Sequence, residues 1–192
     1  MNIIDYEVYN LGNVDANHYH GISSAYDNGA FSIAASLVNP TANTDTVETN
    51  NLDLELAITY TGFDKVLIGG GYYFNNEEDN TDEEDILNVF VSADMGKLLL
   101  GAEYIEVQTE NALIGDLDGY MLLADYDFND KLGVAFRISS NETETANEDY
   151  DKVTIAPNYS FTDRLGAIIE YSDIDQGTTD VNLLAVELTY TF

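Results

Sequence analysis

The chain has 192 residues, of which 36 are acidic and only 6 basic, and its formal net charge at pH 7 is -30. A hydrophobic content of 45% is too high for a disordered chain. Nucleic-acid binding is not expected because phosphate contacts need Lys and Arg, and the lack of cysteine excludes disulfides and thiolate metal sites.

Alternating apolar and polar residues predict twelve β-strands. In the stretch 51–61, Leu54, Leu56 and Ile58 fall on one face of a strand, whereas Asp53 and Glu55 fall on the other. The predicted strands lie at 2–10, 17–26, 30–38, 51–61, 65–74, 85–94, 97–107, 117–127, 131–140, 150–160, 164–173 and 182–192. No run of eighteen apolar residues occurs, so no membrane helix is expected.

Four of the six basic residues mark a repeat. Lys65, Lys97, Lys131 and Arg164 are spaced by 32, 34 and 33 residues, and each lies in a short turn between two predicted strands. About 33 residues per unit suits a β-hairpin of two long strands plus one long loop. The long, polar and acidic connections are predicted at 39–50, 75–84, 108–116, 141–149 and 174–181.

The two faces of these strands indicate a membrane wall. Strands of about ten residues span the apolar layer of a bilayer, and Tyr and Phe gather near the strand ends, as in aromatic girdles. Gly, Ala, Ser, Thr, Asn and carboxylates on the opposite face suit a wet lumen. We therefore predict one all-β domain over 1–192, an antiparallel up-and-down transmembrane β-barrel with short turns at one end and long acidic loops at the other.

The last strand and two of the turns carry a family resemblance. The chain ends on VELTYTF, and its turns FNDKLGVAF and FTDRLGAIIEY resemble those of the outer-membrane β-barrel porins of Gram-negative bacteria. This resemblance implies that the barrel-assembly machinery reads Leu188, Tyr190 and Phe192 as an insertion signal. It also implies that the short turns are periplasmic and the long acidic loops extracellular. It further implies contact with outer-membrane lipid and lipopolysaccharide, a homotrimer as a candidate assembly, and no cofactor.

The N-terminus departs from this family. MNIIDYEVYN lacks the basic start and apolar core of a signal peptide, and porins of this kind commonly have sixteen or so strands. Two explanations stay open: a small barrel whose signal was removed, or the C-terminal part of a longer barrel that lacks N-terminal strands. The second is favoured because 2–10 resembles a strand entered midway.

The expected function is a channel for passive diffusion of small hydrophilic solutes. By alternation, mainly carboxylates point into the lumen, and rings of carboxylates favour cations. The predicted pore-lining residues are Asp53, Glu55, Glu103, Asp125, Arg137, Lys152, Glu170 and Glu187. One alternative is a non-channel barrel that acts as an anchor or binds a partner through its acidic loops, and another is a soluble, salt-adapted β protein.

Other candidate sites are weak. His18 and His20 could bind zinc with Asp15, but a polar strand mouth is the simpler interpretation because the ligand set is incomplete. The acidic stretch 75–85 could bind divalent cations weakly, although it lacks an EF-hand pattern. With no cysteine and no nucleophile elbow, we do not expect an enzyme.

Overall fold

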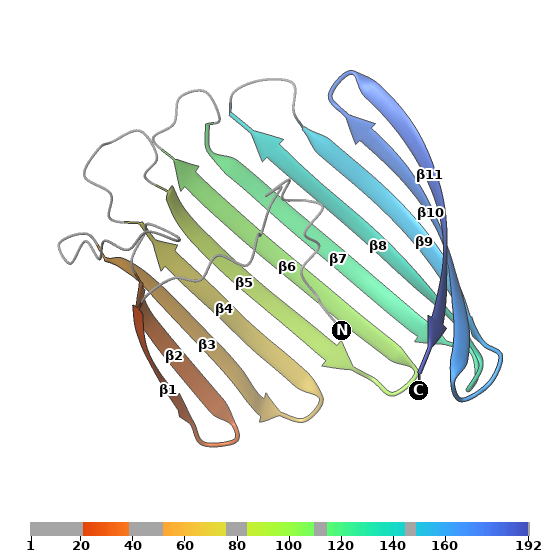
Figure 1. The fold of residues 1–192 in the computed structure, drawn as a ribbon, viewed down its shortest axis with the longest axis horizontal. Coiled ribbons are helices and arrows are strands. Elements are labelled where there is room, and N and C mark those ends of the chain that lie inside the picture. The colour runs from red at the N-terminus through yellow and green to blue at the C-terminus, as the bar shows by residue number, and fades with distance from the viewer. Residues whose placement is uncertain (1–20, 39–51, 76–83, 110–114, 145–148, 192) are drawn as a thin grey trace.

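The computed structural model describes residues 21–38, 52–75, 84–109, 115–144 and 149–191. They form one sheet of eleven antiparallel strands, each paired with its neighbours in the sequence, as Figure 1 shows. The strands are β1 (Gly21–Asp27), β2 (Phe31–Val38), β3 (Asp53–Phe63), β4 (Val66–Phe74), β5 (Glu84–Asp94), β6 (Leu98–Thr109), β7 (Leu117–Asp127), β8 (Leu132–Thr143), β9 (Tyr150–Ser160), β10 (Leu165–Gln176) and β11 (Thr179–Tyr190). The predicted all-β, up-and-down antiparallel fold is confirmed.

The predicted strands from 30–38 onward correspond to β2 to β11, and the strand predicted at 17–26 corresponds to β1. The strand predicted at 2–10 lies outside the described residues. The long loop predicted at 174–181 is wrong, because β10 and β11 continue to a two-residue turn and pair Gln176 with Thr179. Gly177 permits this tight turn with its φ of 58°, a conformation that glycine adopts without strain.

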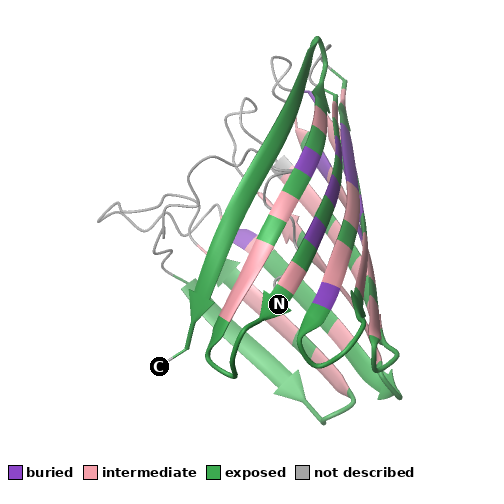
Figure 2. Ribbon diagram, turned by 90° about the vertical axis from the view of Figure 1, so that its right-hand side faces the viewer, coloured by how far each residue is buried: buried purple, intermediate pink, exposed green. Residues whose placement is uncertain are grey.

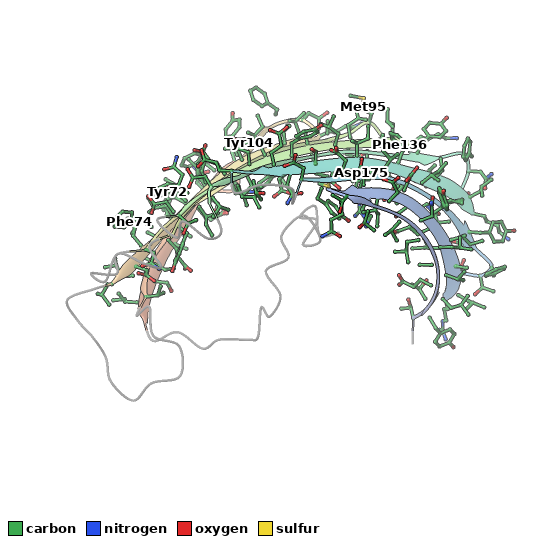
Figure 3. The ribbon with its side chains drawn as sticks, turned by 90° about the horizontal axis from the view of Figure 1, so that it is seen from above. Tyr72, Phe74, Met95, Tyr104, Phe136 and Asp175 are labelled. Atoms are coloured by element: carbon green, nitrogen blue, oxygen red, sulfur yellow. The ribbon has the colours of Figure 1, made fainter. Side chains whose placement is uncertain are left out.

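The sheet is strongly curved, and Figure 3 shows Tyr72, Tyr104 and Phe136 on its convex side. Strand register places the other alternating apolar residues on this same face, where large side chains such as Leu122, Ile155 and Val186 are exposed. In the described part of the chain only three hydrophobic side chains are buried, against eight polar or charged ones. This inverts the usual interior of a soluble protein and matches a wall with lipid on its convex side.

The connections define two ends of the sheet. Short turns join β1–β2, β3–β4, β5–β6, β7–β8 and β9–β10 at one end, called here the turn end; the opposite end is the loop end. At the turn end a single backbone hydrogen bond recurs between neighbouring hairpins. The carbonyls of Ala30, Lys65, Lys97, Lys131 and Arg164 accept from the amides of Thr61, Asp94, Asp127, Ser160 and Thr191, respectively. The repeat positions found in the sequence are thus structurally equivalent.

The two edge strands, β1 and β11, each pair with one neighbour within the described ranges. Figure 2 shows both as exposed along their whole length. Because directions alternate along eleven strands, β1 and β11 both run toward the turn end. An antiparallel barrel can therefore close only if an odd number of further strands lies between β1 and β11. Among the described residues, no helix is long and apolar enough to cross a membrane.

Candidate pore wall

The predicted pore-lining residues share the concave face of the sheet. Glu103 lies opposite Met121, and Arg137 lies opposite Leu123. Their sequence neighbours Tyr104 and Phe136 point to the convex face, so Glu103 and Arg137 point to the concave face. The same alternation along each strand places the whole predicted set there: Asp53, Glu55, Glu103, Asp125, Arg137, Lys152, Glu170 and Glu187.

The two basic residues of this set lie close together. Arg137 on β8 is opposite Thr154 on β9, and Lys152 on β9 is opposite Ser139 on β8, so the two cations are diagonal neighbours on adjacent strands. The remaining four basic residues of the chain, Lys65, Lys97, Lys131 and Arg164, all lie at the turn end. Positive charge on the wall is therefore confined to β8 and β9.

A chain of hydrogen bonds connects this basic region with β10. The Ser172 hydroxyl lies 3.2 Å from Glu170 Oε1, to which it donates, and 2.9 Å from Thr154 Oγ1. These two hydrogen bonds link β9 to β10, and Thr154 is the register partner of Arg137 on β8. Thr154 and Ser172 are both buried, which makes this part of the wall polar without being open to solvent.

Two predicted acidic residues are buried and hydrogen-bonded to side chains that the sequence interpretation did not select. The Tyr73 hydroxyl donates to Asp53 Oδ2 at 2.7 Å, and Asn88 Nδ2 donates to Glu103 Oε1 at 2.5 Å. The exposed fractions of Asp53 and Glu103 are 0% and 8%. Tyr73 and Asn88 have the concave parity of their strands, so alternation could have included them.

Other acidic residues on this face are more accessible. Glu55, opposite Tyr73, and Glu187, opposite Ile168, are exposed, while Asp125, opposite Ala135, is half-buried. Glu55 lies on β3 and Glu187 on the edge strand β11, so the structure does not bring these two carboxylates together. The wall thus carries accessible carboxylates toward both edges and a basic region between them.

Two belts of aromatic residues flank the apolar convex face. At the turn end, edge-to-face ring pairs form at Tyr126–Phe128 and Tyr159–Phe161, with centroids 5.1 Å apart in both, and a third joins Tyr60 and Phe63. Toward the loop end, tyrosine hydroxyls donate to polar groups on the next strand. The pairs are Tyr72–Asp85 at 2.9 Å, Tyr104–Asp118 at 2.5 Å, and Tyr171–Asn182. These belts match the aromatic girdles of membrane barrels.

Leu188 and Tyr190 of the predicted insertion signal lie exposed on the convex face of β11. Phe192, His18, His20 and the acidic stretch 76–83 lie outside the described residues. Within the ranges that the structure describes, no group of three or more His, Asp or Glu residues could hold a metal ion.

A family model described as Gram-negative porin matches residues 4–179. The chain belongs to the Gram-negative porin family. This family consists of outer-membrane channels and not of enzymes, so the chain is a component of the outer membrane of a Gram-negative bacterium. No curated protein sequence matches the chain.

Solved porins share the fold at low sequence identity. A porin refined at 1.8 Å is 20% identical, with a TM-score of 0.70 over 90% of this chain and 62% of that one. A loop-deletion mutant of OmpT, an outer-membrane protein of Vibrio cholerae, is 23% identical, with a TM-score of 0.62 over 88% and 62%. Salmonella typhi OmpF in complex with daunomycin is 15% identical, with a TM-score of 0.70 over 88% and 61%. The chain therefore spans about three-fifths of the length of these porins.

Proposed function

We propose that the chain forms the wall of a channel through which small hydrophilic solutes diffuse passively, and that this channel prefers cations. One observation carries the proposal: charged and polar side chains share the concave face, whereas the convex face is apolar between two aromatic belts. A lipid-facing convex side leaves the concave side for water.

Cation preference is supported by the balance of charges on the concave face. Six predicted wall residues are carboxylates and two are cations, and Lys152 is only 1% exposed. Glu55 and Glu187 are the exposed carboxylates of the predicted set, so they are the ones that a passing ion reaches most directly. Salt screens more distant charges beyond about 8 Å at physiological ionic strength.

The test is the reversal potential of the reconstituted protein in a potassium chloride gradient. We expect permeability to favour potassium over chloride and this preference to weaken in the double variant Glu55→Gln, Glu187→Gln. Asp173→Asn is the matched control, because Asp173 is an exposed carboxylate on β10 with the parity of the convex Tyr171. An anion-preferring channel, or an equal effect of the control, would contradict the assignment of the wall charges.

Burial on the concave face favours a second candidate, a barrel with a filled lumen that serves as an anchor or binding surface. The largest fully buried side chains, Lys152, Asp53, Ser139 and Ser172, all have concave parity. Single-channel recording separates the two candidates, since a filled barrel inserts into the bilayer without discrete conductance steps.

A homotrimer is the assembly we propose, in contact with outer-membrane lipid and lipopolysaccharide after insertion by the barrel-assembly machinery. The support for the trimer is that OmpT of Vibrio cholerae, 18% identical with a TM-score of 0.59, was solved in a trimer form. The mass of the complex in mild detergent tests this assembly.

A further inference from the structure

We propose that the hairpin tips at the turn end bind the zwitterionic phosphoethanolamine headgroup of phospholipids in the adjoining membrane leaflet. Three tips carry the candidate surface: 63–65, 128–131 and 161–164. Each contains an aromatic residue followed by an aspartate and then, directly, by a lysine or arginine. These segments are called the acid–base tips below.

Two of the acid–base tips have the same backbone construction. The amides of Phe128 and Phe161 donate to the carbonyls of Leu132 and Leu165, in each case at 2.9 Å. A side-chain oxygen one residue later caps each turn. Asn129 Oδ1 accepts from the amides of residues 131 and 132, and Thr162 Oγ1 accepts from those of residues 164 and 165. The acid and the base therefore occupy equivalent positions in both tips, and the backbone amide of the base is hydrogen-bonded in each.

An exposed aromatic ring accompanies each acid–base tip. Phe63, Phe128 and Phe161 are 57%, 51% and 49% exposed, although each also contacts a tyrosine ring of its own hairpin edge to face. Aromatic rings favour the boundary between acyl chains and headgroups. The rings thus place the tips at the depth where phospholipid headgroups lie.

The charges at the tips are paired in sequence and exposed. Asp64–Lys65, Asp130–Lys131 and Asp163–Arg164 are adjacent residues, and all six side chains are exposed. A fourth tip, 95–97, has Met95 and Lys97 but Gly96 in place of the aspartate, and Lys97 Nζ donates to the carbonyl of Phe128 at 3.1 Å. This tip lacks the acid, so it serves as a comparison within the chain.

The chemistry of the partner follows from these pairs. A lysine or arginine donates a charge-assisted hydrogen bond to a phosphate oxygen, and the neighbouring carboxylate accepts one from an ammonium group. Phosphoethanolamine offers both groups on one small headgroup. Phosphocholine has no N–H to donate to a carboxylate, and phosphoglycerol has no cation. Toward the loop end, the convex face carries Asp85, Glu106, Asp118 and Glu142, and no basic residue lies there in the described ranges.

Native mass spectrometry of the detergent-solubilised protein tests the proposal. The protein is titrated separately with phosphatidylethanolamine, phosphatidylcholine and phosphatidylglycerol of the same acyl chains. We expect tightest binding of phosphatidylethanolamine. Exposed charge pairs contribute about 0.2–1 kcal/mol each, so the triple variant Asp64→Asn, Asp130→Asn, Asp163→Asn should weaken phosphatidylethanolamine binding by about 1.4- to fivefold per tip.

Two further variants complete the experiment. Lys65→Gln, Lys131→Gln, Arg164→Gln should lower phosphatidylethanolamine binding similarly, while Asp151→Asn, Asp173→Asn, Asp180→Asn, which removes three exposed carboxylates near the loop end, should leave it unchanged. Circular dichroism of each variant establishes that the strands are retained. Equal binding of the three lipids, tighter binding of phosphatidylglycerol, or an equal loss in the loop-end variant would overturn the proposal.

Discussion

Placing one arginine on either side of the sheet tests which face meets lipid. Phe136 and Ala135 are adjacent on β8 and have opposite parity. Phe136 is on the convex face, opposite Ala124 and Ile155, whereas Ala135 is opposite the concave Asp125. We expect Phe136→Arg to destabilise the protein strongly in a bilayer and Ala135→Arg to do so only weakly.

The magnitude follows from depth and exposure. Phe136 is the third of four apolar residues along the convex face of β8, Leu132, Val134, Phe136 and Ile138, which places it near the middle of the apolar layer. An arginine at the midplane of a membrane barrel costs about 2–4 kcal/mol. Phe136 is 43% exposed, and the loss of its contact with lipid adds roughly 1 kcal/mol to the cost of the substitution. The sum is about 3–5 kcal/mol for Phe136→Arg, against about 1 kcal/mol or less for Ala135→Arg, whose charge lies opposite Asp125.

The assay is equilibrium unfolding by guanidinium in phospholipid vesicles, followed by far-ultraviolet circular dichroism because the chain has no tryptophan. The free energy of unfolding is compared among the wild type and the two variants. Equal costs, or a larger cost for Ala135→Arg, would refute the assignment of the convex face to lipid and would exchange the two faces of the wall.

Two other predictions concern assembly and packing. Phe192→Asp, or deletion of Phe192, should lower the amount of assembled barrel in the outer membrane, measured by heat-modifiable migration of membrane fractions, and normal insertion of both variants would count against the insertion signal. Gly69→Ala should lower the free energy of unfolding by roughly 1–3 kcal/mol, because the added Cβ would lie 2.5 Å from Phe90 Cζ and 2.9 Å from the Ile58 carbonyl. Gly71→Ala should lower the free energy of unfolding by less, since the nearest contact of its added Cβ is the Leu56 carbonyl at 3.2 Å. A larger loss for Gly71→Ala than for Gly69→Ala in denaturation would show that the wall is packed differently.

Features that depend on a single strand and its turn were predictable from the sequence. A strand has a side-chain period of two, and water and lipid select opposite residue types on its two sides. The alternation around Leu56 and Ile58 therefore assigned faces that the register reproduces. The turns at Lys65, Lys97, Lys131 and Arg164 were equally predictable, because Gly, Asn and Asp beside a charged residue interrupt the apolar pattern.

The stretch 173–177 shows where local reasoning was insufficient. Two aspartates and a glycine in DIDQG are typical of a loop, yet Asp175 pairs with Asp180 in a regular ladder that ends in the turn at Gly177. Polar residues fit a strand at this height because the loop end of β10 and β11 projects beyond the apolar band. A sequence pattern alone does not say where that band ends.

What the sequence indicated by itself was the strand pattern, a set of charged residues that share one face of the sheet, and a resemblance to porins. Only the tertiary structure decided which of these residues meet. The diagonal approach of Arg137 and Lys152, the Thr154–Ser172 contact, and the bonds from Tyr73 to Asp53 and from Asn88 to Glu103 depend on the relative register of neighbouring strands. That register is set by the pairing of residues some 15 to 20 positions apart in the chain, through hydrogen bonds of the main chain that carry no side-chain signature.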